Sequence, residues 1–447
     1  MPYIRRIKNA AATLATAISF ESTSTNHGKR DAACKYIAEL LENYCGATVE
    51  YVETGGAPAL LATIPGASTD SILYYGHYDV MDPGLKEEWN SDPFKLTTRN
   101  GRFYGRGAGD NKGQLLAVIN GLNRFLLTHP RRRQTIQLLI EGEEEQGSSH
   151  LASTVQQLQL QQLRHVRKVL VVDGSMSVNG EHVLRLANRG LLGIKLRVST
   201  ADHPNHSGNA GNVISNPVLV FQQILNRLYD SKTGRVLIPG FYDGVTEPTL
   251  ADWEAIDQLP FNEAKSAQVF GAEVLAKDKR DYYRRLMFEP TFNVSGIQAG
   301  YNGPGMKTII PNTLTASLNM RLVGQQNPKE IASRLVAELA SVIDEGKLSY
   351  KITSSIPPAN THATSDEIAL FRNAAKQVGV PLLIEPCMPG TVPNYVWTDI
   401  LQAKAFTLPL ANFDQNNHSS NENITQVAFT QGIALIEAIA TEFENRS

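Results

Sequence analysis

The chain has 447 residues, which exceeds the size at which a single hydrophobic core keeps growing, so its length predicts two domains. Hydrophobic residues make up 42% of the sequence, enough to fill two cores, and this favours a soluble globular protein. The 42 Lys and Arg residues nearly balance the 44 Asp and Glu residues, and the net charge of −2 creates no field that attracts polyanions. We therefore expect neither nucleic acid nor a membrane surface as a partner.

The sequence favours a cytoplasmic location. The first twenty residues resemble a signal peptide, but the run after the basic residues is mostly Ala and Thr, so we expect the first helix there. No stretch reaches the roughly eighteen continuous apolar residues that a membrane span needs. Cys34, Cys45 and Cys387 are odd in number and form no C-x-x-C pair, which argues against a disulfide framework or a thiolate zinc site. A reducing compartment fits this cysteine content best.

Short β-branched runs alternate with helical patterns in the first part of the chain. The first of these helices covers 26–44 and stops at Gly46. In chain order we then expect strands at 59–66 and 71–77, a helix at 111–128, a strand at 135–141, a polar helix containing 155–163, and a strand at 168–174. This succession predicts βα units, and hence an α/β domain with a largely parallel sheet.

The pattern changes after Gly190. The segments 191–200 and 315–324 alternate apolar and polar residues like half-exposed antiparallel strands, and 329–345 reads as one long helix. The tail returns to a helix, a strand at 403–410 and a helix at 424–443. We therefore predict a first domain made of 1–189 and 359–447, with an inserted second domain at 190–358.

Acidic and His residues follow the predicted strands of the first domain. The segments concerned are "GHYD" after 71–75, "GEEEQG" after 135–141, "DGS" after 168–172 and "NNHSSNEN" after 404–410, and "GRGAGDNKG" opens the helix at 111–128. In an open α/β sheet the carboxyl ends of the strands share one crevice, so these side chains should meet there. Alone, each segment is more often a helix cap or a solvated turn, but independent caps have no reason to converge on one edge.

Two His and three carboxylates suffice for two metal ions if one carboxylate bridges them. Such a pair would explain the acidic cluster at 141–145, since like charges at this spacing repel unless a cation holds them together. We expect Glu145 to be a ligand, which leaves its neighbour Glu144 free to act as a base. Asp79 lies two residues from His77 and can fix the tautomer of that ring.

These motifs, together with "HSGNAG" at 206–211, resemble in order and context those of one zinc exopeptidase family. Its members include carnosinases, Cys-Gly dipeptidases, carboxypeptidase G, aminoacylases and succinyl-diaminopimelate desuccinylase. "HSG" and "TLTASLNMRLV" are most similar to the carnosinase and cytosolic dipeptidase branch. The resemblance spans nearly the whole chain and implies a mainly parallel-sheet α/β catalytic domain with an inserted α+β domain for lid function and dimerisation.

The resemblance also implies a role for each matching residue. Asp110 is the bridging ligand, His77 and Asp173 complete one metal site, and Glu145 and His418 complete the other. Glu144 is the general base, and Asp79 orients the ring of His77. His206 polarises the scissile carbonyl, often in the active site of the partner subunit of a homodimer. Arg321 and the segment "PGTVPNY" at 389–395, with Gly390 and Thr391, fall where the family holds the substrate carboxylate.

The resemblance favours hydrolysis of an amide bond in a dipeptide, because an Asp at the position of Asp173 accompanies substrates with a free amino group in this family. The implied cofactors are two divalent ions, zinc first, with manganese or cobalt as alternatives. An N-acyl amino acid deacylase of a biosynthetic pathway is the close alternative. A non-catalytic binder that uses the same cleft is disfavoured, because every expected ligand and the base are present.

Overall fold

The computed structural model describes residues 4–446, with the side chain of Val269 excepted, and the chain divides into two compact units. Unit 1 combines Met1–Leu186, Thr361–Glu385 and Val396–Ser447, and unit 2 combines Ala187–Asn360 and Pro386–Tyr395. The sequence-based division assigned 386–395 to the first domain. In the structure this segment joins unit 2, because the Met388 N–H donates to the carbonyl of Ala187 at 2.8 Å.

Unit 1 is built on an eight-stranded sheet with the order β1-β2-β6-β3-β7-β20-β8-β19. The strands are β1 (Thr48–Val52), β2 (Ala59–Ile64), β3 (Ser71–His77), β6 (Thr135–Glu141), β7 (Val166–Val171), β8 (His182–Arg185), β19 (Leu382–Glu385) and β20 (Lys404–Thr407). The central run β6-β3-β7-β20 is parallel throughout, whereas β1, β2 and β8 introduce antiparallel pairs. The predicted α/β class is confirmed, and the sheet is mixed.

Every residue of β3 is buried, which is expected of a central parallel strand that has helices on both faces. A smaller sheet beside the large one has the order β21-β5-β4, formed by β4 (Thr97–Arg99), β5 (Arg102–Tyr104) and β21 (Asn423–Thr425). It joins the segment before α3 (Lys112–Thr128) to the segment before α13 (Gln426–Asn445), so residues some 320 positions apart in sequence are hydrogen-bonded neighbours.

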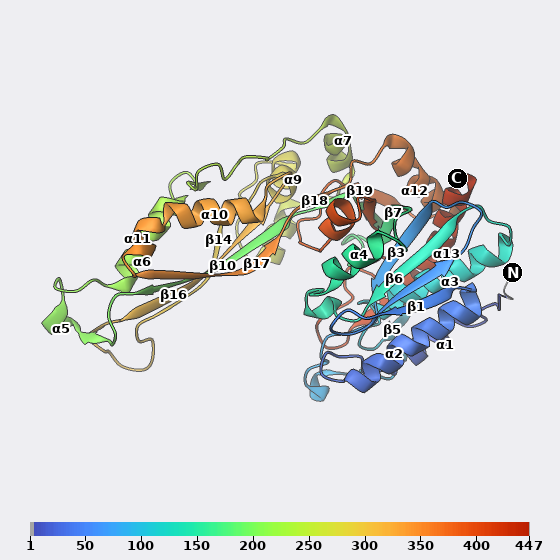
Figure 1. Cartoon of the computed structure of the whole chain (residues 1–447), viewed down its shortest axis with the longest axis horizontal. Helices are drawn as coiled ribbons and strands as arrows, with labels where there is room; N and C mark the ends of the chain where they lie inside the picture. Colours follow the sequence, from blue (N-terminus) through green and yellow to red (C-terminus); the bar gives the residue numbers. More distant parts are fainter. Residues whose placement is uncertain (1–3, 447) are drawn as a thin grey trace. The chain divides into compact units, whose positions relative to one another are not determined.

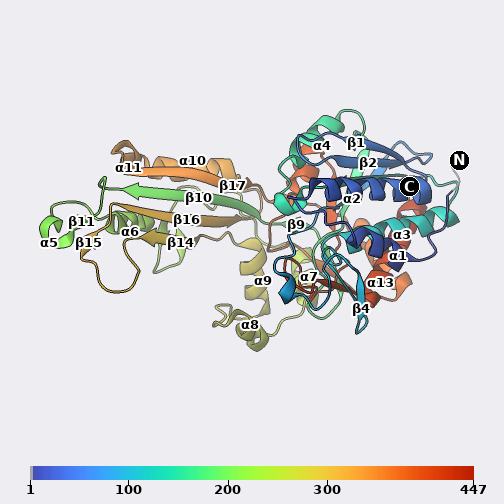
Figure 2. The same ribbon diagram turned by 90° about the horizontal axis from the view of Figure 1, so that it is seen from below.

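The helices of unit 1 pack on this sheet (Figures 1 and 2). They are α1 (Ala10–Ile18), α2 (His27–Leu40), α3, α4 (Leu151–Gln159), α12 (Ser365–Val378) and α13. α3 and α13 lie side by side, and the approach is so close that a Cβ at Gly121 would stand 2.6 Å from the carbonyl oxygen of Ile433. Among the described helices, none combines the length and apolar character that a membrane crossing requires.

Unit 2 contains an antiparallel sheet with the order β14-β16-β10-β17. Its strands are β10 (Gly190–Ser199), β14 (Asn293–Ala299), β16 (Thr313–Leu322) and β17 (Leu348–Ile356). β16 buries every second residue, which places Leu314, Leu318 and Leu322 in one apolar core. α6 (Pro217–Leu228) and α10 (Pro328–Glu338) contribute to the same core, so unit 2 is an α+β unit with its own hydrophobic interior.

The remaining helices of unit 2 are α5 (Ser207–Ala210), α7 (Leu250–Gln258), α8 (Glu263–Phe270), α9 (Lys279–Phe288) and α11 (Ala340–Asp344). The single helix predicted at 329–345 is wrong, because α10 ends before Leu339 and α11 begins after it. Leu339 has φ −99° and ψ 4° and is 1% exposed, so the break in the helix directs this side chain into the core.

Candidate metal centre

Parallel strands of unit 1 deliver the predicted site residues to one edge of the sheet. His77 is the last residue of β3, and Asp173 follows β7 by two residues. Glu144 and Glu145 begin a short 3-10 turn (Glu144–Gln146) three residues after β6, and His418 lies in the loop between β20 and β21. Since the carboxyl ends of parallel strands point the same way, these positions converge although they are far apart in sequence.

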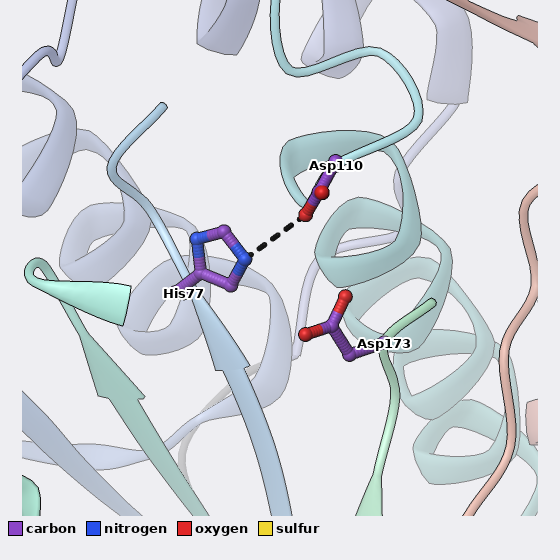
Figure 3. A group of neighbouring side chains, drawn as sticks. All are labelled: His77, Asp110 and Asp173. Atoms are coloured by element: carbon purple, nitrogen blue, oxygen red, sulfur yellow. Dashed lines mark hydrogen bonds and ion pairs between the residues drawn. The ribbon is translucent and has the colours of Figure 1, made fainter. Parts of the chain in front are cut away.

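The first group of side chains consists of His77, Asp110 and Asp173. Figure 3 shows the three pointing toward one another, His77 from the end of its strand and Asp110 from the turn before α3. One ligand atom from each lies within 4.8 Å of the others, and His77 Nε2 stands 3.2 Å from Asp110 Oδ1. The Asp110–Asn111 peptide bond is cis. This group therefore has one imidazole nitrogen and two carboxylates, a donor set suited to zinc.

The second group consists of Asp110, Glu145 and His418. His418 Nε2 lies 3.0 Å from Glu145 Oε2 and 3.4 Å from Asp110 Oδ2. Asp110 thus presents one oxygen to each group, since its Oδ1 faces His77 and its Oδ2 faces His418. The structure brings together all five predicted ligands and gives Asp110 the shared position, which is the arrangement that a bridging carboxylate requires.

Asp79 holds both the first His and the acidic turn. Its Oδ1 lies 3.2 Å from His77 Nδ1, on the side of the ring opposite Asp110. The same carboxylate accepts hydrogen bonds from the backbone N–H groups of Glu144 (3.3 Å) and Glu145 (3.1 Å). A carboxylate on the far nitrogen of a ligating His fixes the ring orientation and leaves the other nitrogen free for a metal.

The electrostatics of the cluster reflect crowded negative charge. Burial raises the pKa of Glu144 to about 9. The His77 imidazole acts to lower this pKa, and the carboxylates of Asp173, Asp110 and Glu145 act to raise it. Burial and Asp110 raise the pKa of Asp173 to about 6. Hydrogen bonds with Asp110 and Glu145 raise the pKa of His418 to about 10. Without a cation the cluster thus takes up protons to relieve repulsion, and this is the behaviour expected of a site built for positive charge.

Four residues that support the site were not predicted from the sequence. Asn111 Nδ2 donates to the carbonyl of Val172 (2.8 Å) and to Asp173 Oδ1 (3.1 Å), and Asn417 Nδ2 donates to Asp110 Oδ2 (3.3 Å). Gln114 and Glu422 hold the loops that carry the ligands. Gln114 Nε2 donates to the carbonyls of Gly109 and Gly174, and Glu422 Oε1 accepts from the N–H groups of Gly109 and Asp110. Asn111, Asn417 and Glu422 stand inside the motifs already recognised, so their adjacency to the ligands was the available signal.

The other predicted residues belong to unit 2. His206 caps α5, where its Nδ1 accepts a hydrogen bond from the Gly208 N–H at 3.0 Å and its Nε2 lies 3.2 Å from Thr308 Oγ1. Arg321 donates from Nη1 to the hydroxyl of Thr391, so these two predicted carboxylate-binding residues are neighbours, with Gly390 next to them in the chain. The roles assigned to His206, Arg321, Gly390 and Thr391 stay predictions.

Residues 73–442 match the peptidase family M20/M25/M40. The chain belongs to this family. It is therefore a metal-dependent hydrolase, and the resemblance to the carnosinase and Cys-Gly dipeptidase branch is confirmed.

Relatives of this M20 family member cover nearly its whole length. The beta-Ala-His dipeptidase of Rattus norvegicus is 28% identical over 427 residues, which make up 91% of this chain and 86% of the rat protein. The Cys-Gly metallodipeptidase DUG1 of Saccharomyces cerevisiae is 24% identical over 449 residues, or 95% of this chain and 93% of the yeast protein. The crystal structure of the M20 family metallo-carboxypeptidase Sso-CP2 from Sulfolobus solfataricus is 29% identical, with a TM-score of 0.87, and the match covers 98% of this chain and 100% of that one.

Proposed function

We propose that this M20 family member is a di-metal dipeptidase that cleaves the amide bond of a dipeptide or a similar small amino-acid conjugate. The observation that carries the proposal is the shared Asp110, which stands between two groups of ligand atoms. Two divalent ions would be held, one by His77, Asp110 and Asp173 and the other by Asp110, Glu145 and His418. The imidazole and carboxylate donors suit zinc best, with manganese and cobalt as alternatives.

Bound divalent ions polarise a carbonyl and lower the pKa of water toward 7, which is the chemistry that the pair would supply. Glu144 lies beside both groups without belonging to either, with Oε2 3.8 Å from His77 Nε2. It takes the proton of the attacking water and returns it to the leaving amine. His206 donates to the developing oxyanion, and Arg321 with Gly390 and Thr391 holds the substrate carboxylate.

The dipeptide substrate is supported by the rat and yeast dipeptidases, each of which matches more than nine-tenths of this chain. A metallo-carboxypeptidase that removes the last residue of longer peptides is the second candidate, because the Sulfolobus structure is a metallo-carboxypeptidase at 29% identity. The deacylase alternative is not favoured by these relatives. The dipeptidase proposal requires recognition of a free amino group one residue from the cleaved bond.

The test is a comparison of matched substrates on the metal-loaded enzyme. Dipeptides such as β-Ala-His and Cys-Gly should be cleaved, whereas the same dipeptides with an acetylated amino group, and tripeptides ending in the same residue, should be cleaved at least tenfold more slowly in kcat/KM. Faster cleavage of the acetylated or longer peptides would replace the dipeptidase with the carboxypeptidase. Absence of bound metal after reconstitution would overturn both.

We also propose a homodimer in the cytoplasm. The dimer is supported by the family's use of a partner histidine at the position of His206, and the location by Cys34 and Cys45, which are buried and form no disulfide. Light scattering coupled to size exclusion measures the mass directly, and a value near the 49.0 kDa of one chain would contradict the dimer.

A further inference from the structure

Glu422 is a buried carboxylate whose side-chain hydrogen bonds all go to one short segment, 106–110. Its Oε1 accepts from the backbone N–H groups of Gly109 (2.8 Å) and Asp110 (2.9 Å). Its Oε2 accepts from the Gly107 N–H (3.0 Å) and from Arg106 Nη1 (2.7 Å). The backbone carbonyl of Glu422 extends the same contact by accepting from Gly105 at 3.0 Å.

The segment that Glu422 holds ends at Asp110, the residue shared by both ligand groups. Residues 105–110 read "GRGAGD", and the three glycines among them offer no side chains that could hold this backbone in place. Glycine is favoured at 107 because that residue has φ +87°, and a Cβ at Gly109 would have to displace the side-chain amide of the buried Gln415. The position of Asp110 therefore depends on the groups that hydrogen-bond to this backbone, which are Glu422 at the N–H groups and Gln114 at the Gly109 carbonyl (2.8 Å).

Glu422 also lies four residues after His418, a member of the second ligand group. One side chain thus joins the loop that carries Asp110 to the loop that carries His418. This link between the two loops is held in place by Arg106, whose guanidinium neutralises Glu422. The guanidinium is itself buried, donates to the carbonyl of Asp82 at 3.2 Å and lies over the ring of Trp89 at 5.2 Å. Hydrogen bonds from N–H groups to an ionised carboxylate are about twice as strong as neutral ones.

We infer that Glu422 is a positioning residue for the metal pair, which fixes the distance between Asp110 and His418 so that one carboxylate can serve both ions. The inference rests on the proposed di-metal function and adds a determinant of it that touches neither metal nor substrate. Loss of the Glu422 charge should weaken both ions together, since Asp110 belongs to both groups. Loss of an ordinary ligand such as His418 should weaken mainly one.

The experiment is zinc titration of metal-free wild type and Glu422→Gln against a competing chelator, well below the melting temperature of each. The amide has the length of the carboxylate, but its NH₂ group would face two N–H donors in place of an acceptor. We expect the dissociation constants of both ions to rise by about 10 to 100-fold, the usual effect of removing a residue that orients metal ligands. The matched control is Glu442→Gln, a buried glutamate of α13 that accepts from Gln377 Nε2, and it should bind both ions like wild type.

The outcomes separate the inference from the proposed function. If wild type binds fewer than two ions, the di-metal proposal fails. If wild type binds two and Glu422→Gln binds them equally well, the positioning role is overturned. If Glu422→Gln does not fold, the double variant Arg106→Met with Glu422→Gln removes the unpaired guanidinium as well and should show the same loss of affinity. Failure of both variants to fold, with metal-free wild type stable, would assign Glu422 to the stability of unit 1 and likewise overturn the inference.

Discussion

Glu144 and Glu145 are adjacent in the chain, but the same substitution should reduce turnover at one and metal occupancy at the other. Glu145 belongs to a ligand group, with Oε2 3.0 Å from His418 Nε2 and Oε1 held by the Met81 N–H at 3.2 Å. Glu144 belongs to neither group. Replacing each with Gln keeps the shape of the side chain and removes its charge, so the pair of variants separates a ligand from a base.

The expected magnitudes follow from these positions. Glu145→Gln loses a charged oxygen at one site, so occupancy of that site should fall and the variant should retain close to one ion. Glu144→Gln should keep both ions and bind substrate, but its turnover should fall by roughly 10² to 10⁴, or about 3 to 5 kcal/mol in the barrier, because an amide cannot carry the proton. Burial raises the pKa of Glu144 to about 9, so at pH 7.5 its metal-free carboxyl is protonated. Metal binding should therefore release about one more proton from wild type than from Glu144→Gln.

Metal stoichiometry, substrate affinity and turnover should be measured on both variants side by side, and proton release by calorimetry in buffers of different ionisation enthalpy. Loss of metal by Glu144→Gln with retention by Glu145→Gln would exchange the two roles. If both variants kept metal and activity, the acidic cluster would be a solvated turn. Equal proton release from wild type and Glu144→Gln would refute the protonated state of Glu144 in the metal-free protein.

Three further outcomes are expected. Asp110→Ala should lower metal content as well as activity, because one side chain serves both groups, and near-full occupancy of both sites by elemental analysis would exclude the bridging role. His206→Ala should cut turnover by roughly 10²-fold with both metals retained, and mixing it with inactive Glu144→Gln should restore part of the activity in hybrid dimers; no recovery despite proven subunit exchange would place His206 in cis or outside the reaction. Burial lowers the pKa of His182 to about 4, so its neutral form stabilises the fold above the unfolded pKa of about 6.5 and this stability is lost as pH falls. His182→Leu should therefore gain about 2 kcal/mol over wild type between pH 7.5 and pH 5 in urea unfolding of the metal-free proteins, and parallel pH profiles would contradict this.

The fold class could be predicted because its signals are local. The alternation in β16 and the apolar run at 72–75 of β3 indicate which faces of these strands are buried. The break at Leu339 could not be foreseen, since 329–345 contains no residue that ends a helix and the cause lies in how that side chain reaches the core. The transfer of 386–395 to unit 2 was hidden for the same reason, because it follows from pairing with Ala187, about 200 residues earlier.

The proposed metal ligands could be predicted from the sequence for a physical reason. A metal ligand must present a nitrogen or oxygen at an open position, and in a parallel sheet such positions lie at the carboxyl ends of the strands, where His77 and Asp173 stand. The residues that hold the ligands in place follow no such rule. Glu422 resembles a solvated residue in a polar loop, and its role depends on hydrogen bonds to Asp110 and Arg106 more than 300 positions away. Sequence order thus predicts which side chains could bind a metal, whereas the accuracy with which they are placed depends on buried contacts that only the folded chain creates.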